Sequence, residues 1–336
     1  MEYRKLGDSG LFVSQLGLGT NAFGKRADEQ TSIRVINAAL DKGINFLDTA
    51  NIYADSASET IIGKALQGKR QQIVLATKAG LPKKLTNDVI SKGSSYQGSS
   101  RRHLMQELDE SLQRLQTDYI DLYQIHSFDP HTPLEETLRT LETMITSGKV
   151  RYIGASNYMA WEMMKALGIS DKLGINRYIS IQQSYSLADR TLEREIMPMC
   201  LDQQIGIIPY FPLAGGILTG KYNNYNDDAH LPDRSRAASD PNFQRFLTAE
   251  AVTLGQQVTK IAASINTTPA ALSLAWLMHQ PAVATVIVGA TSKEQVEANF
   301  AAVPLSQSLS ADTITQLDNI SRSSRKGDPF ASYRLN

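Results

Sequence analysis

Short apolar runs alternate with longer amphipathic stretches along most of this 336-residue chain. In the stretches, apolar residues recur every three or four positions, which is typical of helices with one buried face. The runs that we expect to be strands are Leu16–Leu18, Asn45–Leu47, Ile73–Thr77, Ile120–Ile125, Val150–Ala155, Tyr178–Gln182, Ile205–Tyr210 and Thr285–Val288. The clearest helical stretches are Gln30–Lys42, Ser58–Leu66, Arg101–Leu115, Leu134–Ser147 and Tyr158–Leu167. A regular strand–helix alternation predicts a parallel sheet, and eight such units predict an α/β protein with a closed (β/α)8 (TIM) barrel.

The amino terminus breaks this alternation. Two short runs, Tyr3–Leu6 and Leu11–Ser14, flank a Gly-Asp-Ser-Gly turn at 7–10, which predicts a β-hairpin that caps the barrel floor. Two later segments, 80–100 and 214–244, are rich in Gly, Ser, Asn and Pro, and we expect them to form lids or pocket walls. The prediction is therefore one barrel domain over residues 1–320, followed by a polar and basic tail at 321–336 that is flexible rather than part of the pocket.

Charge and cysteine content favour a small-molecule ligand in a reducing compartment. Lys plus Arg and Asp plus Glu both total 34, so the balance of charge suggests neither a nucleic-acid nor a membrane partner. The single cysteine, Cys200, lies among apolar residues and is expected to be a buried packing residue. We see no signal peptide and no apolar run of about 20 residues, which predicts a cytoplasmic protein. No apolar stripe assigns an oligomeric state.

Polar side chains stand where four consecutive strands of the predicted barrel end. They are Asp48 and, five residues later, Tyr53; Lys78; His126; and the pair Ser156-Asn157. Each has an ordinary explanation by itself, as a helix cap, a solvated lysine or a packing residue. Adjacent parallel strands lie about 4.8 Å apart, however, so these side chains should meet at one rim of the barrel.

Together these groups suit proton transfer to a carbonyl oxygen. A tyrosine has a pKa near 10, and the cation of Lys78 would lower it. Asp48 would keep the buried lysine charged, and His126 would donate a hydrogen bond to the substrate carbonyl. We therefore expect Tyr53 to protonate the oxygen while a cofactor delivers hydride to the carbon.

Two other interpretations compete at this level. The run Gly17–Ala22 satisfies the G-x-G-x-x-A dinucleotide fingerprint, but no helix opens at these glycines, because helical periodicity begins only near Gln30. Lys78 could instead form a Schiff base in a barrel aldolase, which would require a neutral, desolvated amine.

The residues at the strand ends resemble the catalytic tetrad of the aldo-keto reductase superfamily, an Asp, a Tyr, a Lys and a His that match Asp48, Tyr53, Lys78 and His126. The resemblance covers nearly the whole chain. Within the superfamily, the chain most resembles the bacterial branch of inositol-operon and general-stress reductases. That branch also resembles potassium-channel β-subunits. The matching motifs are Leu16–Thr20, Leu47–Ala50, Gly154–Asn157, Pro209–Leu213 and Val288–Ala290.

The resemblance implies an NADPH-dependent reductase of aldehydes or ketones without a metal, and it assigns cofactor contacts. Ser156, Asn157 and Gln182 would hold the nicotinamide carboxamide, and Tyr210 would stack on the ring. Gly19, Thr20, Asn21 and Asp48 would line the cofactor near the first two strands. Phe211, Pro212, Leu213, Gly215 and Lys221 would follow the pyrophosphate. Gly289, Thr291, Ser292, Lys293, Gln295 and Asn299 would receive the adenosine phosphate.

The chain departs from the family pattern at the adenosine end. Many relatives carry a basic residue at the position of Gly289 or an arginine at the position of Gln295, so Lys293 is the cation left to select NADP over NAD. An NADH-preferring dehydrogenase and an NADPH-binding regulatory subunit, similar to the channel subunits, are therefore the alternative functions.

Overall fold

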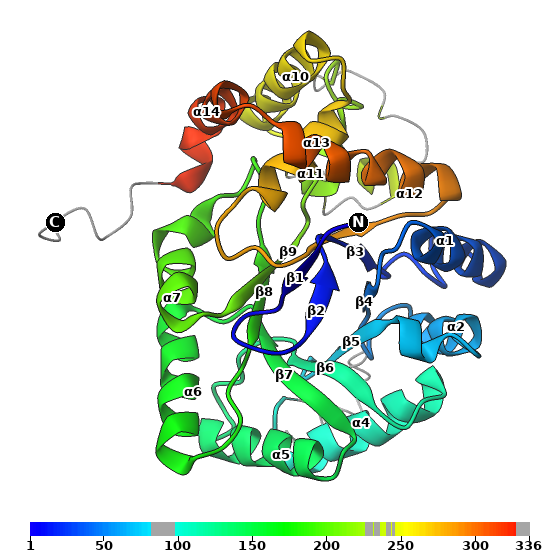
Figure 1. Cartoon of the computed structure of the whole chain (residues 1–336), viewed down its shortest axis with the longest axis vertical. Coiled ribbons are helices and arrows are strands. Elements are labelled where there is room, and N and C mark those ends of the chain that lie inside the picture. Colours follow the sequence, from blue (N-terminus) through cyan, green and yellow to red (C-terminus); the bar gives the residue numbers. More distant parts are fainter. Residues whose placement is uncertain (82–97, 226–230, 232–235, 240–242, 244–245, 327–336) are drawn as a thin grey trace, which may run out of the picture.

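Eight parallel strands form one sheet that curves into a barrel (Figure 1). The computed structural model describes residues 1–81, 98–225, 231, 236–239, 243 and 246–326. Neighbouring strands follow the order of the chain, and the last strand lies beside the first. The remaining edges are joined by Ile207, whose N–H donates to Ala282 O at 2.7 Å and whose carbonyl accepts from Ala284 N at 3.0 Å. The predicted (β/α)8 barrel is confirmed.

The strands fall where the apolar runs predicted them. Each run overlaps one strand, and most bounds differ by one or two residues. The strands are β3 (Leu16–Gly19), β4 (Phe46–Asp48), β5 (Val74–Ala79), β6 (Ile120–Ile125), β7 (Val150–Ser156), β8 (Ser180–Ser184), β9 (Gly206–Tyr210) and β10 (Val286–Gly289).

Alternate residues of each strand point into the barrel or toward the helices. Phe46, Val74 and Leu122 belong to an inner apolar cluster, whereas Leu47 and Leu75 pack in the outer cluster between sheet and helices. Both faces of the sheet are buried, which explains why most of these strands appear in the sequence as mainly apolar runs.

The amino-terminal hairpin closes one end of the barrel, as predicted. Strands β1 (Tyr3–Lys5) and β2 (Phe12–Ser14) pair antiparallel. Leu6 and Val13 are fully buried in the inner cluster, and Arg4 Nη1 donates to Met278 O at 2.7 Å. The hairpin therefore lies across the barrel floor, where Figure 1 shows it in dark blue.

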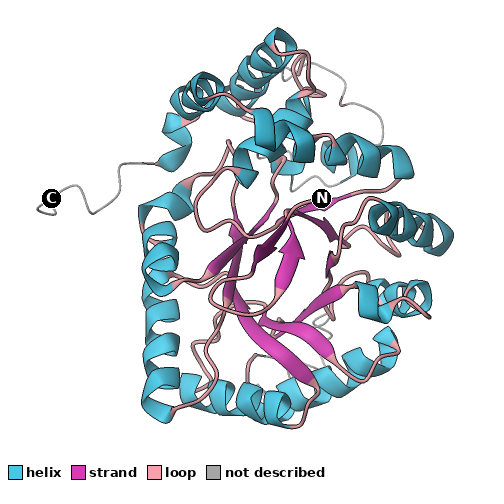
Figure 2. Ribbon diagram, in the orientation of Figure 1, coloured by secondary structure: helices cyan, strands magenta, loops and turns pink. Residues whose placement is uncertain are grey.

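Helices surround the sheet (Figure 2). The five predicted ones are present, and further helices follow in the second half of the chain. Several begin with a side-chain cap, such as Asp28 accepting from Thr31 N before the first helix. The described helices are α1 (Glu29–Asp41), α2 (Ala57–Ala65), α4 (Arg101–Leu115), α5 (Leu134–Thr146), α6 (Ala160–Leu173), α7 (Ile196–Gln203), α8 (Arg236–Ser239), α10 (Ala249–Ser264), α11 (Pro269–Met278), α12 (Lys293–Phe300), α13 (Ala302–Ser308) and α14 (Ala311–Ile320).

The segments outside the alternation are described only in part. Residues 82–97 of the first predicted wall segment lie outside the described residues, and the second begins with a 3-10 helix at Ala214–Thr219. The start of the predicted tail forms a 3-10 helix at Arg322–Arg325, and Arg325 Nε lies 2.7 Å from Glu193 Oε2. Residues 327–336 of the tail lie outside the described residues.

Among the described residues, no single helix has the length and apolar composition needed to cross a membrane, and α10 and α11 meet those criteria only as a pair bent by 92°.

Candidate active site

The polar layer at one end of the barrel follows from strand alternation. Phe46 points inward, so Asp48, two residues later, also points inward; Val74 and Ala76 place Lys78 in the same way. The register aligns Asp48 with Ala76 on β5 and Lys78 with Gln124 on β6. Apolar residues thus fill the lower interior, and charged and amide groups occupy the carboxyl ends of the strands.

Lys78 joins the predicted catalytic side chains. Its Nζ lies 2.6 Å from Asp48 Oδ2, donates to Thr49 O at 2.8 Å and lies 3.4 Å from the Tyr53 hydroxyl. The side chains of Lys78 and Asp48 are 0% and 2% exposed, so little solvent screens this ion pair. The sequence prediction that these three residues meet is confirmed by the geometry.

Both carboxylate oxygens of Asp48 accept hydrogen bonds. Besides Lys78, Asp48 accepts at Oδ1 from Gln124 Nε2 at 3.1 Å and from Gln182 Nε2 at 2.9 Å. Sequence reasoning did not select Gln124 as a site residue. The signal was present, because Gln124 lies two positions after the inward-facing Leu122 at the end of a predicted strand.

Charge and burial set the protonation of this group. Burial would lower the pKa of Lys78, but the Asp48 carboxylate and the Tyr53 oxygen act in the opposite direction, and the net pKa is above its ordinary value. Lys78 is therefore a protonated ammonium at neutral pH. A charged Lys78 does not favour the Schiff-base interpretation, because an amine nucleophile must be neutral.

The pKa of Tyr53 departs from the sequence expectation. Burial raises the pKa of Tyr53, and although Lys78 acts in the opposite direction as predicted, the net pKa lies above its ordinary value. The expected net lowering is thus wrong, because the desolvation of the phenolate exceeds its attraction to the ammonium. Tyr53 therefore holds its proton at neutral pH.

His126 is a neutral imidazole beside Tyr53. The two rings meet edge to face with centroids 5.9 Å apart. Burial, together with the charge of Lys78, lowers the pKa of His126 to about 3. His126 can accordingly donate a hydrogen bond at neutral pH, but it cannot act there as a charged acid.

Two buried carboxylates on the surrounding helices contact the strand end at Lys78 and the loop of Tyr53 from outside the barrel. Glu59 Oε1 on α2 accepts from Thr77 Oγ1 at 2.6 Å, next to Lys78. Glu107 Oε2 on α4 accepts from Asn51 Nδ2 at 2.7 Å, in the loop that carries Tyr53. These contacts fix the backbone on both sides of the Lys78–Tyr53 contact.

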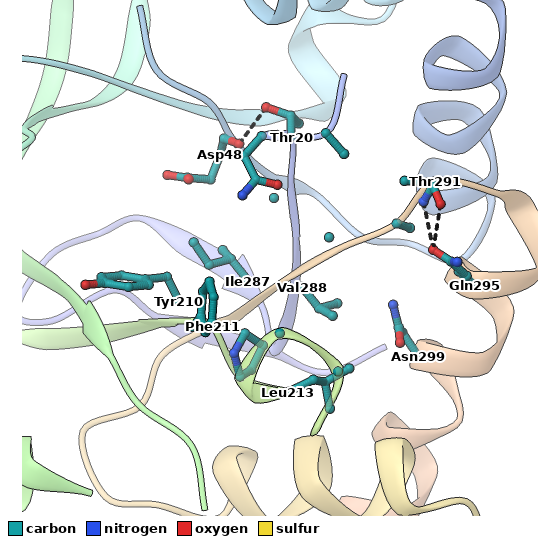
Figure 3. Close-up of a pocket in the computed structure, with 18 of the residues that line it drawn as sticks. Thr20, Asp48, Tyr210, Phe211, Leu213, Ile287, Val288, Thr291, Gln295 and Asn299 are labelled. Carbon is teal, nitrogen blue, oxygen red and sulfur yellow. Dashed lines mark hydrogen bonds between the residues drawn. The ribbon is translucent and has the colours of Figure 1, made fainter. Parts of the chain in front are cut away.

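A cavity of about 680 Å³ opens above this layer (Figure 3). Its wall includes Tyr53 and His126 as well as most of the predicted cofactor residues. The latter are Gly19, Thr20, Asn21, Asp48, Ser156, Asn157, Gln182, Tyr210, Phe211, Pro212, Leu213, Gly215, Lys221, Gly289, Thr291, Gln295 and Asn299. Lys78 lies beneath the wall, and Ser292 and Lys293 are not part of it. Residues such as Arg26, Thr219, Ala270 and Ala298 also line it, although the sequence did not point to them.

Asn157 links the ends of three strands. It adopts a left-handed conformation with φ +57°, its Nδ2 donates to His126 O at 2.9 Å, and its Oδ1 accepts from the Tyr210 hydroxyl at 2.8 Å. Gln182 Nε2 donates a hydrogen bond to Asp48 Oδ1, while Gln182 Oε1 accepts none from the described residues. The amide oxygen of Gln182 is therefore available to a ligand.

The far end of the cavity carries little charge. Gln295 Oε1 accepts from Thr291 N at 2.8 Å and from Thr291 Oγ1 at 3.2 Å, as the dashed lines in Figure 3 show. Ser292 caps α12 by accepting from Gln295 N, and the Lys293 ammonium lies 3.9 Å from Glu297 Oε1. The assigned contacts of Ser292 and Lys293 to an adenosine phosphate stay predictions.

Comparison with known proteins places this arrangement in a family. Residues 15–322 match the model of the Aldo/keto reductase family. This chain belongs to that family. The (β/α)8 barrel is thus that of an aldo/keto reductase. The fingerprint at 17–22 does not open a helix, since the next helix begins at Glu29.

Similar family members cover almost the full chain. The uncharacterized oxidoreductase YrpG of Bacillus subtilis is 36% identical over 95% of this chain and 96% of its own. Aldo-keto reductase YhdN of the same organism is also 36% identical, over 89% and 87%. A probable voltage-gated potassium channel subunit beta of Arabidopsis thaliana is 33% identical over 97% and 98%. The chain is therefore similar both to oxidoreductases and to a channel subunit.

No group of three or more His, Cys, Asp or Glu side chains that could hold a metal ion occurs within the described ranges. The single cysteine, Cys200, is buried and free, in agreement with its predicted packing role.

Proposed function

We propose that this protein is an NADPH-dependent reductase of aldehydes or ketones in which Tyr53 donates the proton. The observation that carries the proposal is the contact of the Tyr53 hydroxyl with Lys78, which is itself paired with Asp48, directly beneath a cavity that His126 also lines. A cytoplasmic location belongs to the same proposal, since a single cysteine is typical of proteins in a reducing compartment.

The cavity fits a nicotinamide dinucleotide in its donors and its charge. Among the described wall residues, Asp48 is the one carboxylate, and it is neutralised by Lys78. Lys221 offers a cation to the pyrophosphate, the ring of Tyr210 offers an aromatic face, and Gln182 Oε1 offers an acceptor to a carboxamide N–H. When bound, NADPH supplies the hydride that reaches the carbonyl carbon.

Tyr53 provides the proton. The carbonyl oxygen becomes an alkoxide as its carbon is reduced, and an alkoxide is far more basic than a phenolate. The proton therefore passes from the Tyr53 hydroxyl to that oxygen. The ammonium of Lys78, 3.4 Å away, stabilises the phenolate that is left, and Asp48 keeps Lys78 charged.

His126 orients the substrate. Its pKa of about 3 keeps the imidazole neutral, so its N–H can donate a hydrogen bond to the carbonyl oxygen without competing as an acid. A donor fixed at the position of developing negative charge lowers the barrier to carbonyl reduction.

The Tyr53→Phe variant tests the proposal. General acid catalysis contributes roughly 10²- to 10⁴-fold to rate, so NADPH oxidation with a panel of aldehydes should fall by that range while NADPH binding stays nearly intact. Tyr152→Phe, which alters a partly buried tyrosine near the barrel floor, is the matched control. Wild-type turnover by Tyr53→Phe would rule out this role.

The similarity to a probable channel β-subunit supports a second candidate, an NADPH-binding regulatory subunit. Turnover separates the two functions. Protein that binds NADPH tightly but oxidises none of it with any aldehyde in the panel would favour the regulatory function.

The cofactor preference has its own test. Lys293 stands outside the cavity wall, and Gln295 is engaged by Thr291. These contacts leave NADH as an alternative cofactor. The ratio of kcat/KM for NADPH to that for NADH measures the preference, and Gln295→Arg should raise this ratio.

A further inference from the structure

An arginine that sequence analysis did not select stands in the wall of the proposed active-site cavity. Arg26 lies in the loop between β3 and α1 and lines the same cavity as Tyr53 and His126. Its side chain is exposed and makes no hydrogen bond or ion pair with any described residue. The guanidinium is therefore free to meet a ligand at the cavity opening.

The loop holds this side chain in place through its backbone. Arg26 N donates to Ala22 O at 2.8 Å, and Gly24 N donates to Ala27 O at 2.8 Å. Phe23 and Ala27 are 0% and 3% exposed, so both sides of the loop are anchored in the core. Because these contacts involve the backbone and neighbouring side chains, replacing the Arg26 side chain should leave the loop intact.

The same loop packs against the turn that carries the proposed acid. A Cβ added at Gly24 would lie 2.8 Å from Ala57 Cβ and 3.3 Å from Ala54 Cβ, just after Tyr53. Arg26 is thus placed on the Tyr53 side of the cavity opening, whereas Lys221 follows β9, which is separated from β3 by one strand, β10.

The charge of the described cavity wall favours an anion. Arg26 and Lys221 are its cations, and its carboxylate, Asp48, is neutralised by Lys78. His126 is uncharged. Partial burial of the exposed Arg26 side chain lowers its pKa, and among the described residues no acidic side chain acts against this effect.

We propose that Arg26 binds an anionic group, a carboxylate or a phosphate, of the ligand in this cavity. This anionic group is either a phosphate of the dinucleotide or a charged group on the carbonyl substrate. The guanidinium matches both in geometry, because it presents paired N–H donors to two oxygens. The second possibility, an anionic carbonyl substrate, rests on the proposed reductase function.

The experiment compares Arg26→Ala with Lys25→Ala. Lys25 is the exposed neighbour that does not line the cavity, so both variants lose one positive charge from the same loop. One arm measures the Kd of NADPH by fluorescence. The other measures kcat/KM with succinic semialdehyde, which carries a carboxylate, and with butanal, which does not.

Loss of a charge-assisted hydrogen bond should weaken binding roughly 10- to 100-fold. A higher Kd for NADPH in Arg26→Ala identifies the dinucleotide as the source. A lower kcat/KM for succinic semialdehyde with butanal unchanged identifies the substrate. Arg26→Lys should recover part of either loss, and Lys25→Ala should show none. Equal values for Arg26→Ala and Lys25→Ala in both arms would overturn the proposal.

The outcome stays separate from that of the reductase proposal. If the wild type reduces no aldehyde, the reductase function fails, but the NADPH arm still applies. Calorimetric binding of succinate to the NADPH-loaded protein then replaces the kinetic arm. Equal succinate and NADPH affinities in the two alanine variants would again reject a role for Arg26.

Discussion

Replacing Asp48 by asparagine removes the charge that keeps Lys78 protonated inside the barrel. Lys78 Nζ lies 2.6 Å from Asp48 Oδ2, with side chains 0% and 2% exposed. Asp48 also accepts from Gln124 and Gln182, so two carboxylate oxygens serve three side-chain donors. Asparagine has one acceptor oxygen and an NH2 group. At least one of the three donors would therefore face the NH2 group, which cannot accept a hydrogen bond.

The magnitude follows from the burial of the pair. Removing one partner of a buried ion pair costs roughly 3–5 kcal/mol, because the other charge stays buried without compensation. The pair of Glu29 and Lys64, with side chains 48% and 45% exposed, offers the matched control. We expect Asp48→Asn to lower the free energy of unfolding by about 3–5 kcal/mol and Glu29→Gln to lower it by less than about 1 kcal/mol.

The effect of pH on the free energy of unfolding, as far as Lys78 causes it, should have opposite signs in the wild type and in Asp48→Asn. In the wild type the pKa of Lys78 is raised above its ordinary value of 10.5, so its contribution to stability is complete below that pH and is lost as the pH rises through the folded pKa. In Asp48→Asn, burial acts without the carboxylate and lowers the pKa of Lys78 below the unfolded value. The folded variant then binds fewer protons than the unfolded chain, and its stability rises with pH up to about 10.5.

Urea denaturation followed by circular dichroism at pH 7 and pH 9 measures both effects. The variant should gain stability between these two pH values, and Lys78 should cause no such gain in the wild type. If Asp48→Asn loses no more stability than Glu29→Gln, or if its stability changes with pH as the wild type does, the buried ion pair does not have the role argued above.

Three further predictions follow from burial and packing. NMR titration should show His126 neutral at every pH above about 5, since burial and a nearby cation lower its pKa to about 3; an imidazole pKa between 6 and 7 would contradict this. Gly63→Ala should destabilise the protein by about 1–3 kcal/mol in thermal unfolding, because the new Cβ would lie 2.4 Å from Arg114 O. Gly168→Ala, with nothing within 4 Å, should be neutral or stabilising in its helix, and equal effects of the two changes would refute the packing argument. Burial raises the pKa of the Cys200 thiol to about 12, so the folded protein should react with a thiol reagent at pH 8 far more slowly than the urea-unfolded chain.

Much of the fold could be predicted because both faces of a parallel barrel are buried. Runs such as Ile73–Thr77 are mostly apolar, and each run overlaps a strand. The amphipathic stretch Arg101–Leu115 coincides with α4. Burial imposes the strand and helix periodicities directly on the order of residues, so a sequence is enough to reveal them.

The candidate site was only partly predictable. Asp48, Tyr53, Lys78 and His126 could be named because each stands at or just after the end of a predicted strand, where the barrel gathers side chains. Gln124 could have been found by the same alternation. Arg26 could not, because its loop has no periodicity, and only the structure shows that its guanidinium lines the cavity without a partner among the described residues.

The sequence by itself determined the eight strands, the capping hairpin and the identities of the groups at one rim, since these depend on local order and on which side chains are apolar. The tertiary structure decided the balance between desolvation and charge attraction at the groups of this rim. The pKa of Tyr53 is raised rather than lowered, because desolvation grows with the number of surrounding atoms, which come from distant segments, while the opposing attraction comes from one cation, Lys78. The place of Arg26 in the cavity wall and the shape of the cavity are likewise properties of the assembled barrel, because they depend on which residues of different loops come within contact.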